Sequence, residues 1–141
     1  MTKELWINLP VKNILKSREF FTQIGFELNT QYGNSENSAC FFVGTKKIVI
    51  MLFEESAFKG VVRNTVSDAK TASEVLFSFD AENKEEVDMI AVKIKKAGGI
   101  LFSEPAEFHG WMYGFGFCDI DHHRWNVLYM DMSKMPKTVK E

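Results

Sequence analysis

Residues 110–132, GWMYGFGFCDIDHHRWNVLYMDM, contain two apolar runs separated by an acidic turn. The first run, Trp111 to Cys118, is aromatic and spaced by glycines; the second, Arg124 to Met130, has Asn126 as its one neutral amide. Aromatic and β-branched residues favour a pleated sheet, and glycines within a strand leave room for a bulge or for the close approach of a ligand. The stretch therefore predicts two strands joined by a turn. It also holds two of the three histidines, so we expect part of any chemistry here.

The residues of the N-terminal half predict one strand, one helix and three further strands. Alternating apolar residues indicate a strand over Leu5 to Val11, with Leu9 facing inward and Asn8 facing the other way. Asn13 is a suitable N-cap for a helix that runs to about Ile24, where Gly25 stops it. On this helix the charged side chains, Arg18 among them, are expected to face water. The strands that follow are predicted at Phe26 to Tyr32, Ala39 to Val43 and Lys47 to Phe53.

The C-terminal half repeats this order. Alternation predicts a strand from Glu74 to Asp80, with Phe77 and Phe79 on its inner face. Asn83 is the predicted N-cap of a helix that ends at Gly98, because apolar residues recur on one helical face. A strand begins at Ile100, although Pro105 limits its regularity, and the opening stretch then supplies the last two strands.

The repeated order predicts an α+β fold made of two βαβββ modules with curved mixed sheets around a shared concave cavity. In each module one sheet face is covered by a helix and the other is free to line the cavity. The expected boundaries are a first module at 1–55, a connector at 56–73, a second module at 74–132 and a tail at 133–141.

Composition excludes several classes of function. The 141 residues are 45% hydrophobic and carry a net charge of −2, and no lysine-arginine cluster offers a nucleic-acid-binding face. No apolar run reaches the roughly 20 residues that cross a bilayer, and no signal peptide is evident, so we expect a cytoplasmic protein that does not bind membranes. Cys40 and Cys118 are expected to be buried free thiols.

Two phrases carry a resemblance to a known group of proteins. LPVKNILKSREFFTQIGF (residues 9–26) and GWMYGFGFCDIDHHRWNVLYMD (residues 110–131) resemble the vicinal oxygen chelate superfamily. This group includes glyoxalase I, bleomycin- and fosfomycin-resistance proteins and extradiol dioxygenases. The chain is most similar to short bacterial proteins described as predicted lactoylglutathione lyases. The resemblance implies the glyoxalase/bleomycin resistance fold, a small-molecule ligand in the sheet cavity and a homodimer.

The resemblance also implies where a metal would bind in this superfamily. Its metal-dependent members hold a divalent ion with four His, Glu or Gln side chains from the first and last strands of each module. In this sequence those places fall to Trp6, Met51, Glu74 and Asn126. Trp and Met offer no oxygen or imidazole ligand, and a neutral amide is a poor substitute for a carboxylate. We therefore expect no cofactor at the usual metal site.

Glu74 and His109 are the candidates for catalysis. Glu74 on the cavity side of its strand could be a general base, or it could be a solvated strand-end residue. His109 lies in a loop at the mouth of the second module and could contact a ligand. If a metal does bind, a rearranged set using Glu74 and His109 is the alternative. The protein would then be a metal-dependent lyase or dioxygenase.

The predicted ligand-binding residues are aromatic or amide side chains with a histidine and a methionine: Trp6, Asn8, Met51, His109, Trp111, Tyr113 and Asn126. Aromatic rings can stack on a planar ligand, and a buried amide needs a hydrogen-bond partner. Arg63 and Arg124 could hold an anion, although isolated arginines are usually solvated. His122 and His123 are interpreted as turn residues, because neighbours on a strand point to opposite faces. A non-catalytic interaction domain is the third alternative.

Overall fold

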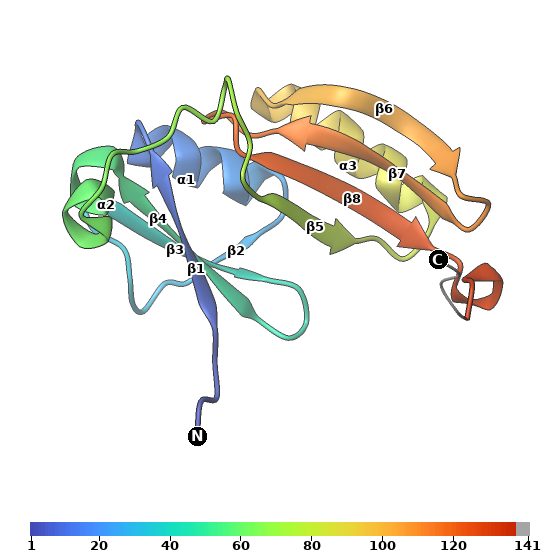
Figure 1. Cartoon of the computed structure of the whole chain (residues 1–141), viewed down its shortest axis with the longest axis horizontal. Coiled ribbons are helices and arrows are strands. Elements are labelled where there is room, and N and C mark those ends of the chain that lie inside the picture. Colours follow the sequence, from blue (N-terminus) through green and yellow to red (C-terminus); the bar gives the residue numbers. More distant parts are fainter. Residues whose placement is uncertain (138–141) are drawn as a thin grey trace. The chain divides into compact units, whose positions relative to one another are not determined.

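The computed structural model describes residues 1–137 and divides the chain into two compact units, one ending at Ala72 and the other beginning at Ser73. Each unit holds one four-stranded sheet (Figure 1). Of the predicted tail, residues 138–141 lie outside the described residues.

The first unit has a mixed sheet in the order β1-β4-β3-β2, in which β1 and β4 are parallel and the other pairs antiparallel. Two helices accompany it (Figure 1). The elements are β1 (Trp6–Val11), α1 (Ile14–Gln23), β2 (Glu27–Leu28), β3 (Ser38–Val43), β4 (Ile48–Glu54) and α2 (Glu55–Val62).

The core of the first unit lies between its sheet and α1. Leu9 of β1, Phe41 of β3 and Leu52 of β4 are buried on one sheet face, together with Phe20 and Phe21 of α1. The inward orientation of Leu9 confirms the predicted alternation along the first strand. The helix begins as predicted, because the Asn13 side chain accepts a hydrogen bond from the backbone N–H of Lys16 at 3.0 Å.

Strand β2 is much shorter than the predicted strand from Phe26 to Tyr32. Its ladder stops at Leu28 because Asn29 folds the backbone into a turn. The Asn29 Oδ1 atom accepts hydrogen bonds from the backbone N–H groups of Gln31 (2.9 Å) and Tyr32 (3.2 Å). Such local side-chain bonding competes with strand pairing.

The second unit repeats the topology, with a sheet in the order β5-β8-β7-β6 and β5 parallel to β8. Helix α3 lies along one face of this sheet (Figure 1). The elements are β5 (Leu76–Asp80), α3 (Lys84–Ala97), β6 (Ile100–Phe108), β7 (Met112–Cys118), β8 (Arg124–Met130) and the 3₁₀ helix η1 (Met132–Lys134).

Helix α3 has the predicted signals at both ends. Asn83 Oδ1 accepts from the backbone N–H of Glu86 at 2.8 Å, and the Glu86 side chain accepts from the backbone N–H of Glu82 at 3.1 Å. Gly98 ends the helix with a φ of 101°, in the left-handed region that glycine tolerates. Val87, Ala91 and Ile94 are buried, which confirms the predicted apolar stripe.

Strand β6 continues through Pro105, and it is irregular there, as the sequence predicted. Its pairing with β7 shifts register twice, between Leu101 and Ser103 and between Ser103 and Ala106. A proline is tolerated here because β6 is the edge strand of the sheet and the ladder is already irregular.

The predicted α+β class with two four-stranded mixed sheets is thus confirmed. None of the helices within residues 1–137 is long and apolar enough to span a membrane.

Candidate functional site

The sheet of the second unit has one face against α3 and one face opposite it, which we call the open face. Along β8, Trp125 and Val127 are buried on the α3 side, so Arg124 and Asn126 point to the open face. Asn126 lies in register with Ser78 of β5 and Gly116 of β7. The alternation of side chains along the strand therefore brings a serine, an amide and an arginine to one face.

Asn126 has an unsatisfied polar atom on this face. Its Oδ1 atom is buried and has no hydrogen-bond partner among the described residues. A buried acceptor without a partner costs about 1–3 kcal/mol. Buried side-chain acceptors in native proteins nearly always have a partner, so this atom is a candidate contact for a hydrogen-bond donor.

An aromatic side chain and a guanidinium lie next to Asn126. A Cβ atom on Gly116 would lie 2.3 Å from the Phe102 ring, so the ring packs directly on this glycine. The Arg124 guanidinium carbon lies 4.5 Å from the centroid of the same ring. The glycines of the first run do permit a close approach, as the sequence predicted, but at Gly116 the approaching group is the protein's own Phe102.

The acidic turn before β8 is held by one buried carboxylate. Asp119 is 2% exposed, and its Oδ1 atom accepts from the backbone N–H groups of Asp121 (2.9 Å) and His123 (3.0 Å). Its Oδ2 atom accepts from the Trp125 indole N–H at 3.0 Å. Burial raises the pKa of Asp119 to about 6, against the opposing effects of the His123 imidazole and the Trp125 hydrogen bond. His122 has the left-handed backbone that the turn requires (φ 67°), so the turn interpretation is confirmed.

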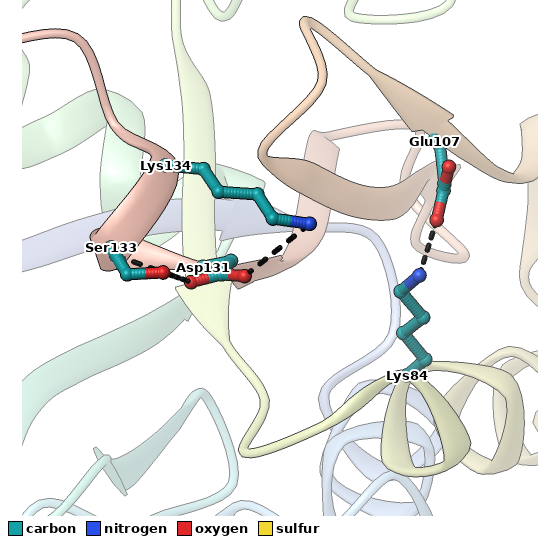
Figure 2. Close-up of polar contacts among 5 residues, drawn as sticks. All are labelled: Lys84, Glu107, Asp131, Ser133 and Lys134. Carbon is teal, nitrogen blue, oxygen red and sulfur yellow. Dashed lines mark hydrogen bonds and ion pairs between the residues drawn. The ribbon is translucent and has the colours of Figure 1, made fainter.

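Tyr113 lies on the opposite face of the sheet from Asn126. Its hydroxyl donates to Asp88 of α3 at 2.7 Å, and this bond raises the pKa of the phenol. The Lys84 ammonium lies 5.6 Å from the centre of the tyrosine ring and forms an ion pair with Glu107 of β6 (Figure 2). Tyr113 therefore links the sheet to α3 and is not brought together with Asn126.

Figure 2 also shows how the chain turns after β8. Asp131 accepts a hydrogen bond from the Ser133 hydroxyl at 2.6 Å and lies 3.8 Å from the Lys134 ammonium. These contacts cap η1, which begins at the last residue of the predicted second module and continues into the predicted tail.

The prediction that a strand begins at Glu74 was wrong. Strand β5 begins at Leu76, which pairs with Arg124, the first residue of β8. The turn held by Asp119 fixes where β8 starts, so residue 74 has no strand to pair with. Glu74 is exposed in the segment that precedes β5, so it is not part of the sheet whose open face holds Asn126.

His109 and Trp111 lie in the turn between β6 and β7. His109 is exposed, has a left-handed backbone (φ 55°), and contacts the ring of Phe108 edge-on. Trp111 is half-buried, and its carbonyl accepts from the backbone N–H of Asp131 at 2.7 Å. Within the described part of the chain, no three or more His, Cys, Asp or Glu side chains are grouped so that they could hold a metal ion.

The first unit places the other predicted residues on the sheet face away from its core. Asn8, Met51 and Cys40 are in register across β1, β4 and β3, and Trp6, 54% exposed, is two residues before Asn8. Gly33 packs on this face, because a Cβ on it would lie 2.6 Å from Cys40 Cβ and 3.3 Å from Met51 Sδ. Both cysteines are buried free thiols, as predicted.

The donor set does not fit a divalent ion at the superfamily's usual position. Trp6 and Met51 provide neither oxygen nor imidazole, Glu74 is exposed outside the strand, and Asn126 provides one neutral oxygen. The orphaned acceptor at Asn126 would be satisfied by a hydrogen-bond donor without any metal.

A hollow in the first unit was missed by the sequence reasoning. It has a volume of about 440 Å³ and is lined by Arg18, Leu28, Thr30, Asn34 and Ser35. Arg18 was expected to face water, but it is half-buried and its Nη2 atom donates to the carbonyls of Ser35 (3.2 Å) and Ser38 (3.1 Å). Its Nε atom is buried without a partner among the described residues. No local pattern signals this contact, because the carbonyls belong to the loop before β3 and to the first residue of β3, 17 and 20 residues further along the chain than Arg18.

No model of a protein family and no curated protein sequence matches the chain. Solved structures do match. A hypothetical protein from S. aureus is 31% identical, with a TM-score of 0.80, over 91% of this chain and 94% of that chain. A glyoxalase/bleomycin resistance protein/dioxygenase family enzyme from Burkholderia phytofirmans is 21% identical, with a TM-score of 0.75, over 89% and 98% of the two chains.

The fosfomycin resistance protein FosX from Listeria monocytogenes, in complex with Mn(II) and sulfate, is 22% identical. Its TM-score is 0.64, over 90% of this chain and 89% of that chain. The chain therefore belongs to the same family as the S. aureus protein, and it has the fold of the glyoxalase/bleomycin resistance proteins.

Proposed function

We propose that the protein binds a small organic molecule on the open face of the second sheet, with Asn126 as the polar anchor and without the usual four-ligand metal site. The observation that carries the proposal is the buried Asn126 Oδ1 atom, which has no partner among residues 1–137. A ligand that donates a hydrogen bond to this atom would remove a cost of about 1–3 kcal/mol.

The surroundings of Asn126 suit a small ligand with polar and apolar parts. Ser78 is the neighbour of Asn126 in register and offers a hydroxyl, while the Phe102 ring, 43% exposed, offers an apolar surface. Ligand sites are typically apolar surfaces with a few well-placed polar groups. A mutant of FosX from L. monocytogenes has been crystallised with Mn(II) and 1S,2S-dihydroxypropylphosphonic acid, so a protein of this fold can hold a small organic molecule.

Metal content tests one part of the proposal. Protein purified without chelators is expected to contain no stoichiometric metal, because Trp6 and Met51 cannot act as ligands to a hard divalent ion. Elemental analysis would contradict this part if it found one equivalent of Ni, Zn, Fe or Mn that is lost on substitution of Asn126 or Glu74.

A near-isosteric substitution tests the anchor. A fragment library is screened by NMR against the wild type, and the fragments that shift the Asn126 side-chain amide are titrated against Asn126→Leu. The variant is expected to lose this binding, since leucine retains the volume but removes the acceptor. Asn64→Leu, which changes an exposed loop amide of the first unit, is the matched control and should bind as the wild type does. Unchanged affinity in Asn126→Leu would show that the anchor is wrong.

Enzymatic activity and the formation of a homodimer are predictions that rest on the resemblance alone. A lyase or dioxygenase that uses Glu74 would lose its activity in Glu74→Ala while keeping its fold. A homodimer would sediment at twice the mass of the chain. An interaction domain without a ligand would give no fragment that shifts Asn126.

A further inference from the structure

We propose that the ligand of the open face is a small organic acid: Arg124 binds its anionic group while Asn126 accepts from a hydroxyl or N–H beside that group. The inference rests on the proposed function and adds the chemical class of the ligand.

The Arg124 guanidinium is available for an anion. Within residues 1–137 the structure gives it no carboxylate partner and no hydrogen bond; its contact is with the face of Phe102, at 4.5 Å from the ring centroid. A cation–π contact uses the flat face of a guanidinium and leaves the N–H groups at its edge without acceptors. Those N–H groups match the two oxygens of a carboxylate.

Among residues 1–137, Arg124 forms no ion pair with a carboxylate. Cys118, its partner in register on β7, is buried, and burial raises the pKa of its thiol, so the thiol stays neutral. Asp119, the nearest carboxylate along the chain from Cys118, is occupied by the turn and by the Trp125 indole. The positive charge is therefore left for a ligand.

Phe102 gives Arg124 a defined orientation. The ring packs on Gly116, and the guanidinium lies on the ring, so stacking orients the arginine side chain along the open face. An arginine held by stacking loses less conformational freedom when it binds an anion than a freely rotating one does.

The spacing sets the size of the ligand. Arg124 and Asn126 are two residues apart on one strand, so their Cα atoms lie about 7 Å apart and their side chains share a face. One small molecule can reach both if its donor group lies within a few bonds of its anionic group. A compact hydroxy acid or N-acyl amino acid has this arrangement.

The test uses a fragment library in which every organic acid is paired with its neutral primary amide. Binding is followed by NMR on ¹⁵N-labelled full-length protein, through the side-chain signals of Asn126 and Arg124. We expect acids that shift the Asn126 amide to bind roughly tenfold or more tightly than their paired amides, the effect of one charge-assisted pair. Arg124→Met should abolish the preference, and Arg124→Lys should keep part of it.

Arg63→Gln is the matched control, because Arg63 is an exposed arginine of the first unit, and its acid preference should equal that of the wild type. The amide spectrum of each variant verifies that it is folded. Equal affinities for acids and amides, or an unchanged preference in Arg124→Met, would overturn the inference while leaving the proposed function intact. Absence of any fragment that shifts Asn126 would instead remove the proposed function itself.

Discussion

The Trp125 indole N–H donates to the buried Asp119 carboxylate at 3.0 Å, and this bond joins the acidic turn to the strand that follows it. Both side chains are 2% exposed. Because Trp125 is held on the α3 side, its neighbours Arg124 and Asn126 must point to the open face. The orientation of the candidate binding residues thus depends on a pair that takes no part in binding.

Asp119→Asn is expected to destabilise the protein. The asparagine oxygen can still accept from the two backbone N–H groups, but its NH₂ group then faces the Trp125 N–H, and two donors meet. We expect the free energy of unfolding at pH 5 to fall by about 2 kcal/mol, measured by urea denaturation. A variant as stable as the wild type at that pH would show that the indole bond contributes little.

The same carboxylate gives the stability a distinct pH dependence. Burial raises the pKa of Asp119 from 3.8 to about 6, so the native state holds this proton more tightly than the unfolded state. Its stabilising contribution is present below about pH 4 and is lost as the pH rises through about 6. The difference in the free energy of unfolding between the wild type and Asp119→Asn should therefore decrease from pH 5 to pH 7, by about 1 kcal/mol. If the difference in the free energy of unfolding widened over this range, the pKa of Asp119 would be lowered in the native state and not raised.

The two glycines of β7 should differ in their tolerance of alanine. A Cβ on Gly114 would lie 2.1 Å from the Val127 carbonyl oxygen, so the backbone must move. A Cβ on Gly116 would meet the Phe102 ring, which is partly exposed and can shift. We expect losses in the free energy of unfolding of about 3 kcal/mol for Gly114→Ala and about 1 kcal/mol for Gly116→Ala. The reverse order in chemical denaturation would contradict this packing.

Arg18→Met tests whether Arg18 holds the loop that precedes β3. The variant loses hydrogen bonds to the carbonyls of Ser35 and Ser38 and should be about 2 kcal/mol less stable. Lys16→Met, an exposed site on the same helix, is the control and should change the stability by less than about 0.5 kcal/mol. If the two substitutions lowered the stability equally in thermal denaturation, the Arg18 side chain would face water, as the sequence predicted.

Asn126→Leu should keep or increase the stability of the free protein while it removes binding. Replacing an unsatisfied buried acceptor by an apolar group of similar volume is expected to add about 1 kcal/mol to the free energy of unfolding. Differential scanning calorimetry of the ligand-free proteins measures this. A clear loss of stability would mean that Asn126 has a structural role.

Local chemistry explains which parts of the fold the sequence predicted. The caps at Asn13 and Asn83, the stripe on α3 and the alternation along β1 are encoded within a few neighbouring residues, and the structure has them. The Asn29 turn that shortens β2 is also local, but it competes with a β-prone sequence. Glu74 was misplaced because the start of β5 is set by its partner β8, more than forty residues away.

The candidate site was predictable only in part. The sequence places Asn126 on the cavity side of its strand only through the resemblance, because its position matches one that faces the cavity in the superfamily. It does not show that Tyr113 belongs to the α3 face or that Phe102 lies over Gly116, because these facts depend on the register between strands and on the bulges in β6.

The most direct test of the central claim is a crystal structure of the protein with the tightest-binding fragment from the paired library. We expect a ligand on the open face of the second sheet, with a donor atom about 2.7–3.2 Å from Asn126 Oδ1. A ligand bound elsewhere, such as in the hollow beside Arg18, with Asn126 Oδ1 still unpartnered, would contradict it.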